Sequence, residues 1–204
     1  MRRENKQQGG AVVVPTPAHW FPYTSDGKDV IGSMAPISGS PTYGVDGAVF
    51  TGGNSQILRY ADVPLSDFKT IALDVYFTTL SGLRKLITFF YNGTSQYGII
   101  CGWDWNVVQY QFWNGSSTQY NLNDPKSNYS INTWYRIVMR MSENNTDVFI
   151  NGEYINSVGA VYTQNVSHTM YVGGREISGR EFYGNVRDFK MWNVALTNEQ
   201  IAEL

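Results

Sequence analysis

The stretch that decides the fold lies near the end of the chain and reads Gly184-Asn185-Val186-Arg187-Asp188-Phe189-Lys190-Met191-Trp192-Asn193-Val194-Ala195-Leu196-Thr197-Asn198-Glu199-Gln200-Ile201. Its first half predicts a β-strand, because Phe189 and Met191 stand at alternate positions and therefore share one face. Val186 is out of phase with both, and an extra residue near Arg187 and Asp188 would restore the register. We therefore expect a strand over residues 182–192 with a β-bulge in its middle.

The second half of this stretch predicts a short helix that runs to Leu204. Thr197 and Gln200 stand at the N-cap and N3 positions of a capping box. Leu196 and Ile201 are placed to form the accompanying hydrophobic staple. No other part of the sequence carries a convincing helix signal.

The chain from His19 onward shows the turn pattern of a β protein. Apolar or aromatic runs end at Asn92-Gly93, Asn114-Gly115 and Asn151-Gly152, and Asn-Gly accepts the positive φ angles of a tight hairpin turn. We expect strands over residues 47–51, 56–60, 69–78, 85–91, 97–103, 107–113, 117–121, 134–141, 147–150, 153–156, 169–173 and 182–192. Short strands at this spacing predict an all-β sandwich of two antiparallel sheets.

Composition narrows the classes of protein and partner. Of 204 residues, 15% are aromatic and only 16% are charged, with a formal net charge of -2. A chain this neutral has no bulk positive field for nucleic acid or an anionic membrane. No apolar run approaches the ~20 residues that span a bilayer. Cys101 is the only cysteine, so no intrachain disulfide or multi-cysteine metal site can form.

Residues 1–18 differ from the domain that we place at 19–204. The start of the chain lacks the apolar core of a signal peptide, which predicts synthesis in a reducing cytoplasm. Pro15 and Pro17 rule out a helix, so we expect an extended arm. One interpretation is a frayed terminus. The other is an arm that anchors the protein to a larger assembly, with Val12, Val13 and Val14 added as a strand to a partner's sheet.

Ordered segments along residues 19–204 resemble laminin-G-like, concanavalin-A-like jelly-roll domains. The closing stretch above matches the family's last strand and helix, and five further segments match in the family's order: Asp46–Phe50, Phe68–Phe77, Asn132–Val138, Val148–Gly152 and Met170–Gly174. The resemblance implies two antiparallel sheets facing each other, one of them concave. It thus agrees with the predicted all-β, two-sheet antiparallel jelly-roll sandwich with a short C-terminal helix.

The sequence predicts a binding protein and not an enzyme. Related sandwiches include glycoside hydrolases, which place two carboxylates at alternate positions of one strand. No strand expected here carries such a pair, and Asp74 stands alone in its strand. The histidines are His19 and His168, without a nucleophile elbow. A pair of Cys101 with His168 rests on co-occurrence alone, and we expect His168 at the start of a strand.

The stretch from Gly98 to Gly115 is the strongest candidate for ligand binding. It predicts a hairpin with a tip rich in tryptophan, carboxylate and amide groups. Aromatic rings pack on the apolar face of a sugar, and polar side chains bond its hydroxyl groups. The candidate glycan-binding residues are Trp103, Asp104, Trp105, Asn106, Tyr110, Trp113 and Asn114.

Several of these positions have a second interpretation. Trp103 and Trp113 are also compatible with the sandwich core. Tyr110 and Gln109 lie on opposite faces of one strand, so at most one of them faces a ligand. The remaining tryptophans fall in family-like segments, and we expect them in the core: Trp20, Trp134 and Trp192.

The resemblance is also compatible with a Ca²⁺ ion bound at the rim of the sandwich by Asp, Asn and backbone oxygens. Rim-type residues are Asp26, Asp29, Asp46, Asn54, Asp124 and Asn144, but no spacing selects a ligand set. Asp188 is either a rim ligand or an acceptor for loop N–H groups, and we favour the acceptor.

Two hypotheses for function follow. The first is a carbohydrate-binding or adhesion module that is displayed on a virus or bacteriophage particle and binds a cell-surface or secreted glycan. A virion protein is made in a host cytoplasm without a signal peptide and works outside the cell. The second is a structural protein that decorates a capsid or tail through protein–protein contacts, without a sugar site.

Overall fold

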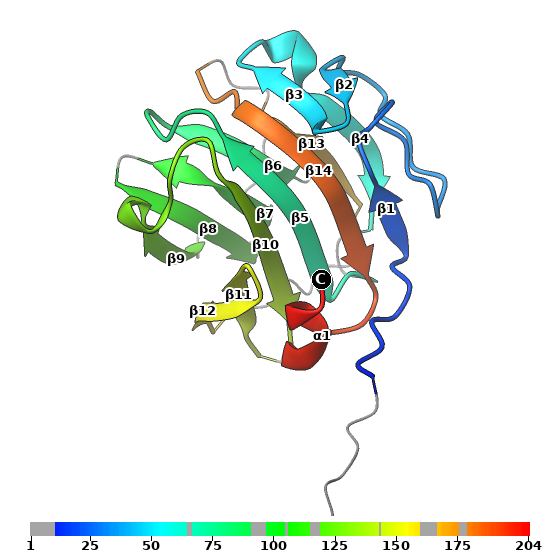
Figure 1. The fold of residues 1–204 in the computed structure, drawn as a ribbon, viewed down its shortest axis with the longest axis vertical. Helices are drawn as coiled ribbons and strands as arrows, with labels where there is room; N and C mark the ends of the chain where they lie inside the picture. The colour runs from blue at the N-terminus through cyan, green and yellow to red at the C-terminus, as the bar shows by residue number, and fades with distance from the viewer. Residues whose placement is uncertain are drawn as a thin grey trace, which may run out of the picture.

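The computed structural model describes residues 11–64, 67–90, 97–104, 106–114, 119–142, 144–159, 167–175 and 179–204. The described residues form two antiparallel sheets that face each other, as Figure 1 shows. The predicted two-sheet sandwich is therefore confirmed.

The larger sheet has eight strands in the order β12-β11-β10-β5-β14-β3-β2, with β1 paired to β14 beside this path. Their bounds are β1 His19–Phe21, β2 Thr42–Gly44, β3 Gly47–Thr51, β5 Thr70–Phe77, β10 Trp134–Met141, β11 Thr146–Ile150, β12 Glu153–Val158 and β14 Tyr183–Trp192. Strands β1 and β2 were not expected. Each has only three residues, too few for an alternating pattern to show.

The smaller sheet has six strands in the order β4-β13-β6-β7-β8-β9. Their bounds are β4 Leu58–Val63, β6 Arg84–Phe90, β7 Tyr97–Asp104, β8 Val107–Asn114, β9 Gln119–Pro125 and β13 His168–Val172. Short 3-10 turns lie at Asn54–Gln56 (η1) and Lys126–Asn128 (η3). As expected, His168 begins a strand.

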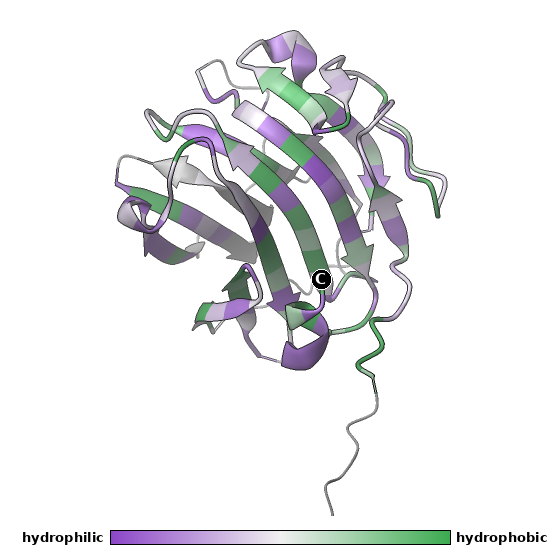
Figure 2. Ribbon diagram, in the orientation of Figure 1, coloured by the Kyte–Doolittle hydropathy of each residue, from purple (hydrophilic) through white to green (hydrophobic). Residues whose placement is uncertain are grey.

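The main core lies between the two sheets. Ile71, Leu73, Val75 and Phe77 of β5 all belong to it and are fully buried, as their alternation predicts. Apolar and polar residues alternate along the strands in Figure 2. Burial of this apolar surface is the main favourable contribution to folding.

A second apolar cluster lies on the outer face of the larger sheet, under helix α1 (Asn198–Ala202). The helix has the predicted capping box, since Thr197 Oγ1 accepts from Gln200 N at 3.2 Å and Gln200 Oε1 accepts from Thr197 N at 2.9 Å. Leu196 and Ile201 are both buried in the cluster. No helix among the described residues is long and apolar enough to cross a membrane.

The described part of the N-terminal arm follows the surface of its own domain beside α1 (Figure 1). Val14 packs against the second cluster. The carbonyl of Pro15 accepts from Trp192 Nε1 at 2.7 Å, and that of Val13 accepts from Gln200 Nε2 at 2.8 Å. Val12 and Val13 remain 43% and 74% exposed. Attachment of the arm to a larger assembly stays a prediction.

Candidate functional site

The predicted bulge in β14 arranges charged residues on the outer face of the larger sheet. The register between β14 and β5 shifts between Arg187 and Lys190, and Asp188 has a φ of +50°. Phe189 still reaches the core. Because the bulge adds a residue, Arg187, Asp188 and Lys190 all join one polar network outside the sheet.

Arg136 of β10 is the centre of this network. Its Nε and Nη2 donate to the two carboxylate oxygens of Asp74 at 2.5 and 2.9 Å, and Nη2 also donates to Asp188 Oδ2 at 2.9 Å. Burial by itself would lower the pKa of the Arg136 guanidinium, but hydrogen bonds and charge from Asp74 and Asp188 raise that pKa above its ordinary value. The ion pairs therefore hold the side chains in one geometry.

Two tryptophans flank the network. The guanidinium carbon of Arg187 lies 3.9 Å from the ring centroid of Trp134, and Lys190 Nζ lies 5.1 Å from that of Trp20. Trp20 Nε1 donates to Asp188 Oδ1 at 2.7 Å. These seven residues cross β10, β5, β14 and β1, and we call them the tryptophan stripe: Trp134, Arg136, Asp74, Arg187, Asp188, Lys190 and Trp20.

The stripe corrects three expectations. Trp20 and Trp134 are half-buried on the outer face and are not in the core, whereas Trp192 is 1% exposed and lies in the second cluster. Asp188 accepts from side chains of Trp20, Arg136 and Lys190, so the preference for loop N–H donors is wrong.

A groove with a volume of about 320 Å³ lies at one end of the stripe. Its lining includes Asp74, Trp134, Arg136 and Asn151, together with the end of α1 at Ile201 and Ala202. Asn151 Oδ1 accepts from the Arg136 backbone N–H at 2.9 Å, which orients the amide. The groove thus combines an aromatic ring with convergent carboxylate, guanidinium and amide groups.

The predicted hairpin exists, but much of its tip lies outside the described residues. Strands β7 and β8 pair from Tyr97↔Asn114 to Asp104↔Val107. Among the seven predicted glycan-binding residues, Trp105 and the side chains of Trp103, Asp104, Trp113 and Asn114 are not described. Asn106 is exposed.

Tyr110 is wrong as a ligand contact. Its side chain is fully buried in the main core, with its hydroxyl 3.3 Å from that of Tyr129. Gln109 occupies the outer face instead, because neighbouring residues of a strand point to opposite sides.

Gln109 belongs to a row of polar side chains on the outer face of the smaller sheet. Gln109 Nε2 donates to Asn123 Oδ1 at 2.9 Å, and Gln111 Nε2 donates to Gln109 Oε1 at 2.5 Å. Lys85 Nζ lies 3.5 Å from Gln111 Oε1. This row crosses β6, β8 and β9 beside the predicted hairpin tip.

The rim carboxylates do not converge on a metal site within the described ranges. No group of three or more His, Cys, Asp or Glu residues there is arranged to hold a metal ion. Asp29 Oδ1 instead accepts from the backbone N–H groups of Trp20 and Ile31, and its Oδ2 contacts His19 Nδ1. Burial would raise the pKa of Asp29, but these hydrogen bonds lower it below its ordinary value.

The sequence singled out Asp74 and Asp188, and the residues that sequence reasoning missed are Arg136, Arg187 and Lys190. Arg136 follows Trp134 by two positions on a strand that was expected, which puts both on one face. The spacing of Trp134 and Arg136 therefore already placed these two residues together. No spacing within the sequence shows that β5, β14 and β1 lie beside β10 and complete the stripe.

The chain belongs to the concanavalin A-like lectin/glucanases superfamily, whose laminin-G-type sequence profile matches residues 50–202. No curated protein matches the chain.

Solved structures share the fold at low sequence identity. Domain 4 of AbnA, an extracellular GH43 arabinanase from Geobacillus stearothermophilus in complex with arabinotriose, is 16% identical with a TM-score of 0.67, covering 94% of this chain and 98% of that one. The ligand binding domain of botulinum neurotoxin serotype D, in complex with N-acetylneuraminic acid, is 12% identical with a TM-score of 0.70. The match covers 92% of this chain and 50% of that one. A pentraxin from Limulus polyphemus is 14% identical with a TM-score of 0.59, and the match covers 76% of this chain and 78% of that one.

Proposed function

We propose that the protein is a non-enzymatic carbohydrate-binding module and that the groove at the end of the tryptophan stripe holds the sugar. The observation that carries this proposal is the placement of Trp134 beside Asp74, Arg136 and Asn151 in one groove. A half-buried indole offers an apolar surface to a sugar ring, while oriented polar groups bond its hydroxyls. Two of the similar structures contain a saccharide, arabinotriose or N-acetylneuraminic acid, which supports this class of ligand.

The arrangement of the carboxylates favours binding over hydrolysis. A glycosidase needs one carboxyl group that donates a proton and a second that acts as nucleophile or base. Asp74 and Asp188 instead share the Arg136 guanidinium, and Asp188 also pairs with Lys190. Both carboxylates are thus engaged by side-chain cations within the stripe and do not stand as a free pair across the groove.

The test is binding to a glycan array by the wild type and two groove variants. Trp134→Ala removes the aromatic surface, and Ala202→Phe fills the groove from the exposed end of α1 without removing a stripe contact. Both should reduce binding at least tenfold, whereas Tyr154→Ala, at a 53% exposed position on the edge strand β12, should not. Unchanged binding in both folded groove variants would show that the sugar site is elsewhere.

A parallel Trp105→Ala variant tests the hairpin that the sequence selected. Loss of binding in this variant alone would transfer the proposal from the groove to the hairpin tip.

Display on a virus or bacteriophage particle is the second part of the proposal, and capsid or tail decoration without a sugar site is its alternative. The exposed valines of the arm support attachment to a partner. Pro15 and Val14 stabilise the domain itself, so the informative change replaces only the exposed pair, as Val12→Asp with Val13→Asp. If these valines anchor the protein, the double variant should stay folded but fail to join the assembly.

A further inference from the structure

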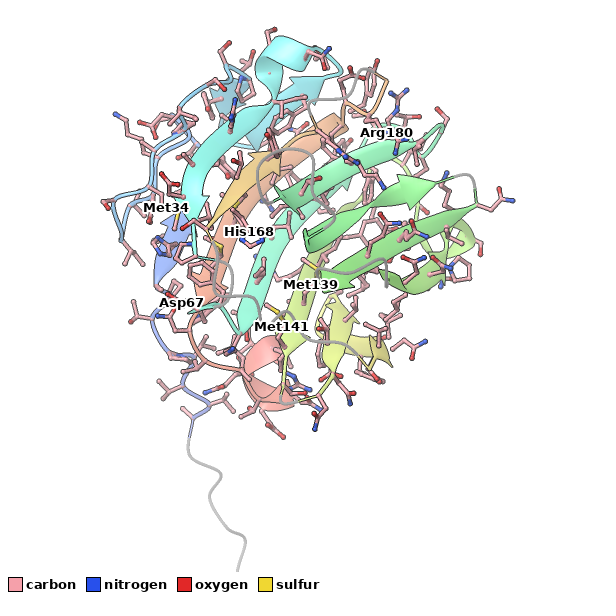
Figure 3. All side chains as sticks on the ribbon, turned by 180° about the vertical axis from the view of Figure 1, so that it is seen from behind. Met34, Asp67, Met139, Met141, His168 and Arg180 are labelled. Atoms are coloured by element: carbon pink, nitrogen blue, oxygen red, sulfur yellow. The ribbon has the colours of Figure 1, made fainter. Side chains whose placement is uncertain are left out.

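A second concavity, which we call the edge pocket, lies where the β11–β12 hairpin meets β9, the last strand of the smaller sheet. Its volume is about 360 Å³, within the ~300–1,000 Å³ of small-molecule sites. Figure 3 shows the hairpin in yellow, next to β10 with its labelled residues Met139 and Met141. The lining comes from β9 and the turn after it on one side and from the hairpin on the other: Asp124, Asn128, Tyr129, Ile150, Glu153 and Ile155.

Asp124 places a buried carboxylate in this pocket. Its cross-strand partner is Val108, which belongs to the main core, so the Asp124 side chain also points between the sheets. Asp124 is only 4% exposed. Asn128 Nδ2 donates to Asp124 Oδ1 at 2.7 Å, which holds the carboxylate in place and leaves Oδ2 able to accept from a ligand.

Glu153 adds a second carboxylate at the mouth of the pocket. It is the cross-strand partner of Ile150, which packs against the main core, and it is itself exposed. Tyr129 and Tyr135 line the same pocket with aromatic surface and are 6% and 8% exposed. Carboxylates and aromatic rings both attract cations, and the described lining contains no Lys, Arg or His. The chemistry of the pocket therefore favours a positively charged group.

The edge pocket adjoins the groove of the tryptophan stripe. Tyr135 and Asn151 line both concavities. Asn151 lies in the turn of the hairpin, where its backbone N donates to Arg136 O at 2.9 Å and its Oδ1 accepts from Arg136 N at 2.9 Å. These two hydrogen bonds fix the turn against β10. Asn151 is thus a fixed boundary between the groove and the pocket, within reach of a ligand in either.

We propose that the edge pocket binds the free amino group of an amino sugar, in an oligosaccharide whose neighbouring residue occupies the groove. The proposal rests on the proposed function of the groove. An ammonium group has three donors and a positive charge, and Asp124 and Glu153 supply the acceptors. An N-acetylated residue lacks that charge, so its binding would leave the buried carboxylate without a charged partner. The preferred ligand is therefore a polysaccharide of glucosamine type with free amines.

The test compares the affinity of the full chain for a chitosan oligomer and for the chitin oligomer of the same length. The two differ only in acetylation of the amine, and a mildly acidic buffer keeps the free amine protonated. The wild type should prefer the chitosan oligomer at least about tenfold. Asp124→Asn keeps an oxygen for Asn128, and both it and Glu153→Gln should reduce this preference to less than about threefold.

The matched control is Asp62→Asn. Asp62 is an exposed acid on β4, at the opposite edge of the smaller sheet from β9, so its neutralisation should leave the preference unchanged. Ile155→Trp, at a 36% exposed position of the lining, should fill the pocket and remove the preference while both carboxylates remain.

Trp134→Ala distinguishes failure of the pocket from failure of the groove. It should weaken binding of both oligomers and leave their ratio unchanged, because it alters only the groove. A loss of this kind without any preference in the wild type would uphold the groove and refute the pocket. A preference that persists in Asp124→Asn and Glu153→Gln, or an equal change in Asp62→Asn, would also overturn the proposal. Polylysine that competes as well as the chitosan oligomer would assign the pocket to a protein amine and refute the amino sugar.

Discussion

Replacing Arg136 by alanine is the sharpest test of the tryptophan stripe as a rigid unit. The change removes three charge-assisted hydrogen bonds, two to Asp74 and one to Asp188. The side chains of Arg136, Asp74 and Asp188 are only 20%, 12% and 24% exposed, respectively. The variant would therefore leave two carboxylates in a partly desolvated environment. Breaking a buried ion pair costs roughly 3–5 kcal/mol, and partial access of water puts our expectation at the low end, about 3 kcal/mol.

The assay is thermal and urea unfolding followed by circular dichroism. A domain of this size loses about 2–4 °C in melting temperature for each kcal/mol, so Arg136→Ala should unfold roughly 6–12 °C below the wild type. The double variant with Asp74→Ala should lose much less than the sum of the single changes, because it removes both partners. The exposed pair of Lys28 with Asp26, at 3.7 Å, serves as the control, and Lys28→Ala should cost less than ~1 kcal/mol. A loss in Arg136→Ala no larger than in this control would refute the reasoning.

Two other variants test local features of the fold. Asp29 has a lowered folded-state pKa, so its contribution to stability is present above its unfolded pKa of about 3.9 and is lost as the pH falls through the folded value. Asp29→Asn should therefore flatten the fall in melting temperature as the pH drops below about 4, and an unchanged profile would contradict this. Gly47 has a φ of +87°, and a Cβ there would lie 2.2 Å from Val186 O, whereas a Cβ at Gly44 would meet nothing within 4 Å. Gly47→Ala should destabilise the domain by more than ~1 kcal/mol and Gly44→Ala should not; equal unfolding midpoints in urea would count against this account.

Most of the strands could be predicted because their signals are local. Residues 134–141 match β10 completely, and the phase change around Val186 correctly predicted the bulge. The capping box of α1 involves residues only three positions apart. The three-residue strands β1 and β2 escaped prediction because they form against β14 and β3 and have no pattern of their own.

The candidate site was much harder to predict. Alternation divides the residues of a strand between two faces, but both faces have the same period of two. The pattern alone therefore does not say which face lies against the core. Trp134 was therefore assigned to the core by its place in a family-like segment, although it lies on the outer face. Tyr110 was placed on the ligand side of its strand, and Gln109 holds that side instead.

The sequence by itself determined the β architecture, the bulge, the capped helix and the family, because each depends on neighbours along the chain or on their order. Only the tertiary structure decided which polar side chains meet on the outer faces. Arg136 is 62 residues from Asp74 and 52 from Asp188, and their contact depends on β10, β5 and β14 being adjacent in one sheet. That adjacency results from packing the whole core, so no local pattern encodes the groove.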